Sequence, residues 1–270
     1  MAKTGERVVR RNFVLAVVTM SIVTAATALE TSGNAANPQA VEEATKGVRD
    51  TANAAWWGFD EEDSTEALQG RRLDGRKPPP GAIDSGAKRV IVPDMTKDWI
   101  VRPIKLAGNQ ELILEDGVVI TAKRGEYRGK SDGVFTASNV ENLTIRGYGA
   151  TIRMQKEDYI VGKVLLDLKW NRWFGQYEKA EWRMALSLRG CSNVNVYGVT
   201  LRDSGGDGLY IAGGRERRPC QNIHVRDVTC DNNYRQGVSI ISAEGLLIEN
   251  SVFSNTWGTI VSEIWLIKAK

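Results

Sequence analysis

The chain has 270 residues and 42% of them are apolar, which is enough for a sizeable core. The net charge of +3 comes from the first 28 residues, which carry four Lys or Arg and one Glu, so the remainder is close to neutral. A near-neutral remainder argues against a nucleic-acid partner, which requires a basic face on the folded domain.

The chain begins with the pattern of a secretory signal peptide. Basic side chains are followed by an apolar run over residues 13–28 that ends in Ala-Thr-Ala, a small-residue cleavage pattern. This run is shorter than the ~20 residues that a membrane-spanning helix needs. We therefore expect residues 1–28 to be removed, the mature protein to be secreted or periplasmic, and no stable membrane insertion. Because Arg10 and Arg11 are adjacent, the twin-arginine route is an alternative to the general secretory route.

The region before the repeats, residues 29–85, is predicted to form a linker and a short N-terminal helical cap. Residues 29–55 have few large apolar side chains, which is typical of a flexible linker or a loosely helical leader. An amphipathic helix is predicted over residues 63–85, with Asp63 or Ser64 as its N-cap. The Pro-rich segment 71–80 cannot continue a helix, so we interpret it as a surface insertion.

Short strands with polar corners then repeat over residues 86–259. Three units, beginning at Cys191, Cys220 and Glu244, each contain an apolar run, a corner of Asn, Asp, Ser or Gly, and a second apolar run. A period in the twenties marks a solenoid, whose units stack to bury a common core. Short strands without a helical period predict an all-β fold, a parallel β-helix. Earlier strands are expected at residues 89–93, 99–101, 103–104, 112–114, 118–120, 142–145 and 151–152.

Two segments break this repeat. Residues 155–182 contain Trp170, Trp173 and Trp182 and many lysines, a composition that indicates a long loop projecting from one rung. Residues 260–270 have no polar corner. Since a solenoid needs a terminal cap over its last rung, we interpret them as a non-repeat tail and the chain as truncated at its C-terminus.

The offsets between units predict which side chains stack. Gly208 aligns with Gly237 at an offset of 29 residues, and Val225 aligns with Ile248 at an offset of 23. The same offsets place Cys191 over Cys220, where the thiols are either buried neighbours or a disulfide; Cys230 is the third cysteine. At one corner they predict a structural ladder of Asp203, Asn232 and Asn255.

Asp207 departs from this ladder. It lies among Gly205, Gly206 and Gly208, which would remove side-chain bulk around its carboxylate and let a ligand approach, although a plain Asp-Gly turn is the alternative. One rung on, Arg235 is expected beside it, either as a structural salt bridge or as a clamp for a sugar hydroxyl or carboxylate. The candidate catalytic residues are therefore Asp207, Asp203, Asp231 and Arg235, and the candidate substrate-binding residues are Glu181, Arg183, Gln236 and Trp257.

A group of carboxylates at one corner would suit two chemistries. Two acids at a suitable separation hydrolyse a glycosidic bond, whereas several oxygen ligands can hold calcium for a lyase. Glu181 and Arg183 flank Trp182 and would either face the same groove or be a solvated pair, and Trp257 would stack on a sugar or pack in the core. No other cofactor is implied, and the single histidine, His224, with no Cys-x-x-Cys motif, indicates no zinc site.

Several runs together resemble a known family: WIVRPIKLAGNQELILEDGVVITAKRG, NLTIRGYGATIRMQKEDY, EWRMALSLRGCSNVNVYGVTLRDSGGDGLYI and RQGVSIISAEGLLIENSVFSNTWGT. They are similar to exported bacterial right-handed parallel β-helix proteins of the pectin-lyase-like superfamily, over about residues 86–259. The resemblance implies a right-handed solenoid and a secreted protein that acts as a hydrolase, lyase or epimerase on a polyuronide or another glycan.

From these observations we expect a monomeric, secreted β-helix protein that cleaves a polysaccharide in a groove along the solenoid. Two other functions stay open, because a solenoid presents long faces that need no chemistry. One is a non-catalytic glycan-binding or surface protein, and the other is an inactive, truncated member of the family.

Overall fold

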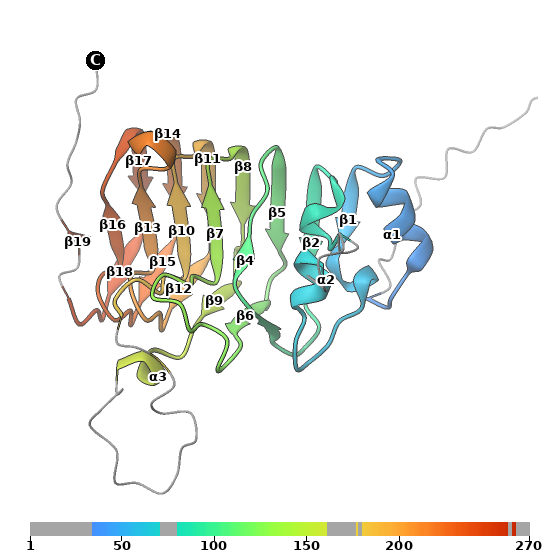
Figure 1. Cartoon of the computed structure of the whole chain (residues 1–270), viewed down its shortest axis with the longest axis horizontal. Helices are drawn as coiled ribbons and strands as arrows, with labels where there is room; N and C mark the ends of the chain where they lie inside the picture. The colour runs from blue at the N-terminus through green and yellow to red at the C-terminus, as the bar shows by residue number, and fades with distance from the viewer. Residues whose placement is uncertain (1–33, 71–79, 161–176, 178–179, 259–260, 263–270) are drawn as a thin grey trace, which may run out of the picture. The chain divides into compact units, whose positions relative to one another are not determined.

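The computed structural model describes residues 34–70, 80–160, 177, 180–258 and 261–262. The expected signal peptide, most of the Pro-rich insertion, Trp170 and Trp173 lie outside the described residues. Within them the chain winds through three parallel sheets, one strand per sheet and per turn, as the predicted β-helix requires (Figure 1). No helix in the described ranges is long and apolar enough to cross a membrane.

From β2 on, each sheet collects every third strand of the solenoid. Sheet I has the order β1 (Thr51–Asn53), β2 (Arg89–Val92), β5 (Gln110–Leu114), β8 (Glu141–Arg146), β11 (Ser192–Tyr197), β14 (Cys220–Arg226) and β17 (Ala243–Glu249). Sheet II has the order β3 (Trp99–Val101), β6 (Val119–Ala122), β9 (Thr151–Arg153), β12 (Thr200–Arg202), β15 (Thr229–Asp231) and β18 (Val252–Ser254). Sheet III has the order β4 (Ile104–Lys105), β7 (Phe135–Ser138), β10 (Leu186–Arg189), β13 (Leu209–Ala212), β16 (Val238–Ile240) and β19 (Val261–Ser262).

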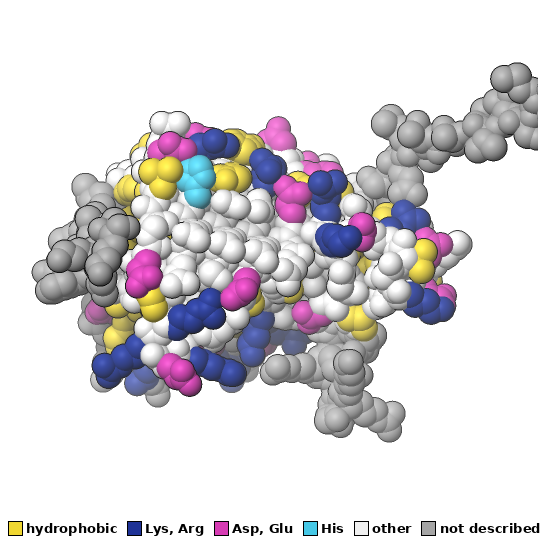
Figure 2. Space-filling model, turned by 90° about the horizontal axis from the view of Figure 1, so that it is seen from above, with side chains coloured by type: hydrophobic (Ala, Val, Ile, Leu, Met, Phe, Trp, Pro, Cys, Tyr) yellow, Lys and Arg dark blue, Asp and Glu magenta, His cyan; other side chains and the backbone are white. Residues whose placement is uncertain are grey.

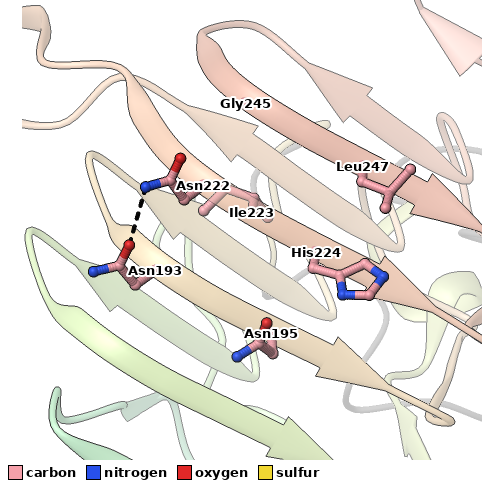
Figure 3. Close-up of a pocket in the computed structure, with 7 residues that line it drawn as sticks. All are labelled: Asn193, Asn195, Asn222, Ile223, His224, Gly245 and Leu247. Atoms are coloured by element: carbon pink, nitrogen blue, oxygen red, sulfur yellow. Dashed lines mark hydrogen bonds between the residues drawn. The ribbon is translucent and has the colours of Figure 1, made fainter.

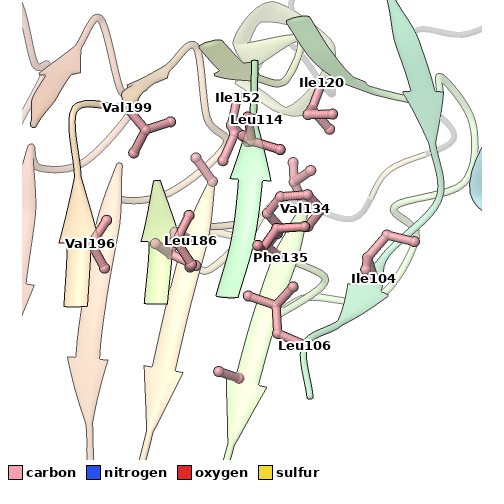
Figure 4. Close-up of a cluster of buried hydrophobic side chains, with 14 of the residues drawn as sticks. Ile104, Leu106, Leu114, Ile120, Val134, Phe135, Ile152, Leu186, Val196 and Val199 are labelled. Carbon is pink, nitrogen blue, oxygen red and sulfur yellow. The ribbon is translucent and has the colours of Figure 1, made fainter. Parts of the chain in front are cut away.

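The core lies between the three sheets and is built from stacked apolar columns (Figure 4). Side chains alternate in direction along a strand, so every second residue points inward. Leu143, Val194 and Ile223 occupy the same position on three neighbouring strands of sheet I, and each is at most 1% exposed. The alternating apolar runs of the sequence therefore become continuous buried columns along the solenoid.

The predicted register is confirmed. Leu209 pairs with Val238 at the offset of 29, and Val225 pairs with Ile248 at the offset of 23. The predicted limits of the repeat differ from the observed ones. Sheet I begins earlier, at β1, and sheet III continues past residue 259, because Val261 in β19 pairs with Val238 in β16. Strand β7 has the weak pattern FTAS and was not predicted.

The N-terminal cap differs from the single predicted helix. Instead, α2 (Thr65–Gln69) and a 3₁₀ turn, η2 (Ile83–Ser85), stand on either side of the insertion. Gly70 and Pro80 pair as an antiparallel bridge, so the two ends of the insertion meet, as expected for a surface loop. The described part of the expected linker is more ordered than predicted, because it forms α1 (Pro38–Thr45), β1 and a second 3₁₀ turn, η1 (Ala54–Trp57).

An asparagine ladder that was not predicted runs along one corner at sheet I. Asn142 donates to Asn109 at 2.8 Å, Asn193 to Asn142 at 3.0 Å, and Asn222 to Asn193 at 3.1 Å, in each case from Nδ2 to Oδ1. All four residues have φ between 53° and 56°, the left-handed region that asparagine tolerates better than most residues. The ladder thus stabilises a bend in four successive rungs.

Replacing Asn193 by alanine is expected to lower the free energy of unfolding by about 1–2 kcal/mol, because alanine strains at this φ and two amide hydrogen bonds are lost. Asn193→Gly is the matched control, since glycine accepts the left-handed conformation without strain. Urea unfolding of both variants measures the difference. Equal losses for the two variants would contradict the contribution of backbone strain.

Candidate functional site

A hollow of about 410 Å³ lies at the corner between sheets II and III, near the last described rungs. This volume is within the ~300–1,000 Å³ typical of small-ligand sites. Three segments build the hollow: the turn between β15 and β16, the turn after β18 one rung on, and the stretch that leads into β10. Its lining residues are Glu181, Tyr234, Arg235, Gln236, Trp257 and Gly258.

Backbone contacts between rungs hold these turns in place. The Arg235 amide donates to the Gly206 carbonyl at 2.9 Å, and the Gly258 amide donates to the Arg235 carbonyl at 2.7 Å. The Trp257 ring meets the Tyr234 ring edge-on, with 6.0 Å between centroids, and the Lys156 ammonium lies 4.8 Å from the Trp257 centroid. Trp257 nevertheless remains 61% exposed, so the hollow has an aromatic wall that a ligand can reach.

Asp207 lies behind this hollow and is completely buried. The expectation that glycines leave its carboxylate open to a ligand is wrong. A side chain at Gly206 would lie 2.8 Å from the Glu181 carbonyl oxygen, and one at Gly205 would lie 2.6 Å from the Tyr159 ring. The glycines are therefore needed because other parts of the chain pack against them.

Burial dominates the electrostatics of Asp207. It raises the pKa of this carboxyl to about 6, against the combined lowering effect of the Ser239 hydroxyl, the Arg235 guanidinium and the Gln236 backbone. Arg235 Nε is 3.6 Å from Asp207 Oδ1, longer than a hydrogen bond, and neither carboxylate oxygen has a partner with full hydrogen-bond geometry. The nearby carboxylate of Glu181 raises the pKa further. The predicted proximity of Asp207 and Arg235 is confirmed.

Asp203 and Asp231 do not form one group with Asp207. They lie where strands of sheet II enter the turns that lead to sheet III, and there Arg202 contacts Asp203 at 2.9 Å and Asp231 at 3.9 Å. Asp231 accepts hydrogen bonds from Asn255 at 2.7 Å and from Ser254 at 2.9 Å. Partial burial acts to raise the pKa of Asp231, but these hydrogen bonds outweigh it and hold the pKa below its usual value. Both carboxylates therefore stabilise the corner.

The predicted corner ladder is present in modified form. Asp203, Asn232 and Asn255 all adopt left-handed φ values between 52° and 55°. Asn232 donates to Asp203 at 2.6 Å, but Asn255 turns to Asp231 rather than to Asn232. Asn232 instead accepts from the buried Lys156 ammonium at 2.5 Å. No sequence pattern indicated Lys156, which reaches this corner from the interrupting segment.

Calcium does not fit this arrangement. Among the residues that the structure describes, no group of three or more His, Cys, Asp or Glu side chains is placed to hold a metal ion. The oxygen ligands that a calcium site needs are divided between the corner at Arg202 and the buried position of Asp207.

Arg183 does not join Glu181 in the hollow. Its side chain is fully buried, Nε donates to the Tyr127 carbonyl at 2.8 Å, and the guanidinium lies 5.1 Å from the Tyr159 centroid and 5.5 Å from that of Tyr177. Two expectations for Arg183 are therefore wrong: it does not face the groove with Glu181, and it does not form a solvated pair with Glu181. It instead anchors the stretch that carries Glu181 to the edge of the hollow.

Gln236, the remaining candidate for substrate binding, lines the hollow and is 8% exposed. Its side chain accepts a short hydrogen bond from the Ser239 hydroxyl. Cys191 and Cys220 stand on adjacent rungs as predicted, and both are buried free thiols. Tyr234 and Gly258 were not predicted as lining residues, although each adjoins a residue that was.

A comparison with protein families agrees with this fold, and a second comparison finds a curated relative. Residues 179–263 match a family described as a right handed beta helix region. The SPbeta prophage-derived uncharacterized protein YorA of Bacillus subtilis (strain 168) is 27% identical over 154 residues, which cover 54% of this chain and 24% of that protein. The chain thus spans about a quarter of the length of the curated relative it matches.

Solved structures share the fold at low sequence identity. An iota-carrageenase from A. fortis has a TM-score of 0.50 and 16% identity, covering 73% of this chain and 39% of that chain. The A-module of the mannuronan C-5 epimerase AlgE4 of Azotobacter vinelandii has a TM-score of 0.50 and 14% identity, covering 76% of this chain and 51% of that module. The three parallel sheets and the match over residues 179–263 together show that the chain folds as a right-handed parallel β-helix.

Proposed function

We propose that this chain is a carbohydrate-active protein that binds an acidic polysaccharide in the hollow between Trp257 and Arg235. The observation that carries the proposal is the exposed Trp257 ring beside a guanidinium in one hollow. An aromatic face suits the apolar face of a sugar ring, and a guanidinium suits a carboxylate or sulfate group. The signal peptide would deliver the protein to the cell exterior or periplasm, where it would act as a monomer.

The solved relatives support polysaccharide as the ligand class. One is described as an iota-carrageenase complexed to iota-carrageenan fragments, and another as a mannuronan C-5 epimerase. Both names specify a polysaccharide for those proteins, at 14–15% identity to this chain. The two cations beside the Trp257 ring, Arg235 in the lining and Lys156 at 4.8 Å from the ring centroid, favour an anionic member of this class.

Replacing Trp257 by alanine is expected to weaken polysaccharide binding about 30-fold, which corresponds to ~2 kcal/mol, the loss typical of an aromatic hot spot. Calorimetric titration with oligogalacturonate and with iota-carrageenan oligosaccharides measures it. Trp182→Ala is the matched control, because Trp182 is 47% exposed but does not line the hollow. Unchanged affinity in Trp257→Ala, or an equal loss in the control, would contradict the proposal.

A second candidate function is cleavage of the bound polysaccharide at the same hollow. It is favoured by two neighbouring carboxyls in unlike environments: Glu181 lines the hollow, whereas buried Asp207 has its pKa raised to about 6. A carboxyl whose pKa is raised by burial, next to a second carboxyl that lines an open hollow, is an arrangement found in acid–base catalysis. Because Asp207 is covered, Glu181 would be the group that meets the substrate, and Asp207 would position Arg235.

Product analysis distinguishes the two functions. A hydrolase releases new reducing ends, a lyase releases unsaturated products that absorb in the ultraviolet, and a binding protein retains the glycan and releases neither. If the protein cleaves, Glu181→Gln is expected to abolish turnover while leaving calorimetric binding within about threefold of the native value, since the neutral side chain keeps the shape of the hollow. Retained turnover in that variant would exclude Glu181 as the acid.

A further inference from the structure

The outer face of sheet I carries a second hollow, remote in the fold from Trp257. Its volume is about 380 Å³, and its lining residues come from β11, β14 and β17 (Figure 3). Asn195, His224 and Leu247 form one row across these strands. Asn193, Asn222 and Gly245 form the adjacent row, which is the asparagine ladder and its end.

The hollow exists because the ladder stops at a glycine. Gly245 has φ +66°, the same left-handed conformation as the ladder asparagines, but it has no amide to donate to Asn222. A β-carbon at this position would lie 3.0 Å from Asn222 Oδ1, so that oxygen faces the empty position. Among the described residues, Asn222 Oδ1 accepts no hydrogen bond, and neither does Asn195 Oδ1, whose amide group donates to Thr144 at 3.2 Å.

The imidazole of His224 forms a fixed wall of the hollow. Its Nε2 lies 2.8 Å from Glu249 Oε1, and its Nδ1 lies 3.2 Å from the Tyr197 hydroxyl. The Tyr197 ring also meets the imidazole edge-on at 5.4 Å. Leu247, at 51% exposure, adds an apolar surface beside it. Two open acceptors, a fixed ring and an apolar side chain are thus held on rigid strands, which lowers the entropy cost of binding.

Within the part of the chain that the structure describes, the charges near this hollow include carboxylates without a cationic partner. Arg146 contacts Glu111 at 3.2 Å and Arg226 contacts Asp227 at 3.4 Å, whereas Glu249 accepts from the His224 ring and Glu244 accepts from the Gln221 amide at 3.1 Å. Blue and magenta side chains are interspersed on the face that carries the histidine (Figure 2). An anionic ligand would therefore be repelled by Glu244 and Glu249, whereas a hydroxyl-rich neutral ligand would supply the missing donors.

We infer that this hollow is a second carbohydrate site, which binds an uncharged sugar unit through Asn195, Asn222, His224 and Leu247. Sugar hydroxyls donate to the two amide oxygens, and the carbon face of the ring contacts Leu247. The site does not depend on the proposed function at Trp257, since it shares no lining residue with that hollow.

His224 is the only histidine in the chain, so its imidazole gives one unambiguous NMR signal. Titration of the full chain with cellohexaose and with maltohexaose is expected to shift this signal saturably with at least one of them, whereas oligogalacturonate shifts it less. The same shift is expected in Arg235→Ala, which separates this site from the hollow at Trp257. Absence of a shift with both neutral probes would overturn the inference.

Gly245→Asn is the decisive variant, because asparagine tolerates the left-handed φ and its amide would extend the ladder to Asn222 and fill the hollow. The expected result is at least a tenfold weaker response of His224, at an unchanged thermal midpoint. Gly47→Asn is the matched control. Gly47 also has a left-handed φ, +71°, and no atom lies within 4 Å of the place that a β-carbon would take there. Gly47 follows α1, far from β17 in the fold (Figure 1). Leu247→Glu, at an exposed position, is a second variant that is expected to fold and to lose binding. Native affinity in either folded hollow variant would overturn the inference.

Discussion

Replacing Asp207 by asparagine is expected to abolish a pH dependence of the native protein. As pH rises from about 4 to about 7, the free energy of unfolding of the native protein should fall by about 3 kcal/mol, and that of Asp207→Asn should not show this fall. Burial raises the pKa of Asp207 from 3.8 in the unfolded chain to about 6 in the folded protein. Between these values the folded state binds more protons than the unfolded state, so its free energy of unfolding falls as pH rises. The loss is complete about one pH unit above the folded pKa, near pH 7, and it stays constant at higher pH.

The measurement is urea unfolding of the native protein and of Asp207→Asn across this pH range. Other carboxyls titrate as well; Asp63 and Asp231, whose pKa values are lowered, lose stabilising interactions in acid. They are present in both proteins, so their contribution cancels in the difference between the two. Asp203→Asn, at the partly exposed corner, is the control and should not show the same difference. A difference that is flat with pH would contradict the burial of a carboxyl at position 207.

Replacing Arg183 by alanine is expected to lower the free energy of unfolding by about 3–5 kcal/mol, the range for truncating a large, fully buried side chain. The substitution leaves the Tyr127 carbonyl without its donor and opens a void between the rings of Tyr159 and Tyr177. Since Arg183 anchors the stretch that bears Glu181, polysaccharide binding at the Trp257 hollow should weaken as well.

Trp182→Ala is the matched control for this substitution too, because Trp182 precedes Arg183 in the sequence but its side chain is 47% exposed. Its removal should lower the free energy of unfolding by less than about 1 kcal/mol. Arg183→Lys keeps a charge and a donor but not the planar fork, and it should fall between the two. Denaturant unfolding gives all three values. An alanine variant within about 1 kcal/mol of the native protein would show that the buried guanidinium contributes little.

The fold was predictable because its signals are local. An alternation of apolar and polar residues specifies a strand, and a Gly or Asn specifies a bend, so the offsets of 29 and 23 could be read directly and match the pairing of Leu209 with Val238 and of Val225 with Ile248. The asparagine ladder could have been found in the same way. It was missed because the long interruption places Asn193 as many as 51 residues after Asn142.

The site was harder to predict because burial depends on distant parts of the chain. The glycines around Asp207 indicate a close approach, but the sequence does not say that Tyr159, Glu181 and Met184 make it rather than a ligand. Arg183 looks like a surface charge until the rings of Tyr159 and Tyr177 enclose it. Lining residues such as Arg235 and Trp257, in contrast, lie on corners whose position follows from the register, and the sequence identified them.

The most direct test of the central claim, that the hollow at Trp257 and Arg235 binds an acidic polysaccharide, is the NMR spectrum of the indole N–H groups during titration with oligogalacturonate and iota-carrageenan oligosaccharides. The signal that disappears in Trp257→Ala identifies the residue. We predict that this signal moves saturably with at least one ligand in the native protein, that it stays in place in Arg235→Ala, and that the signal of Trp182 does not move. A Trp257 signal that is unaffected by both ligands would contradict the claim.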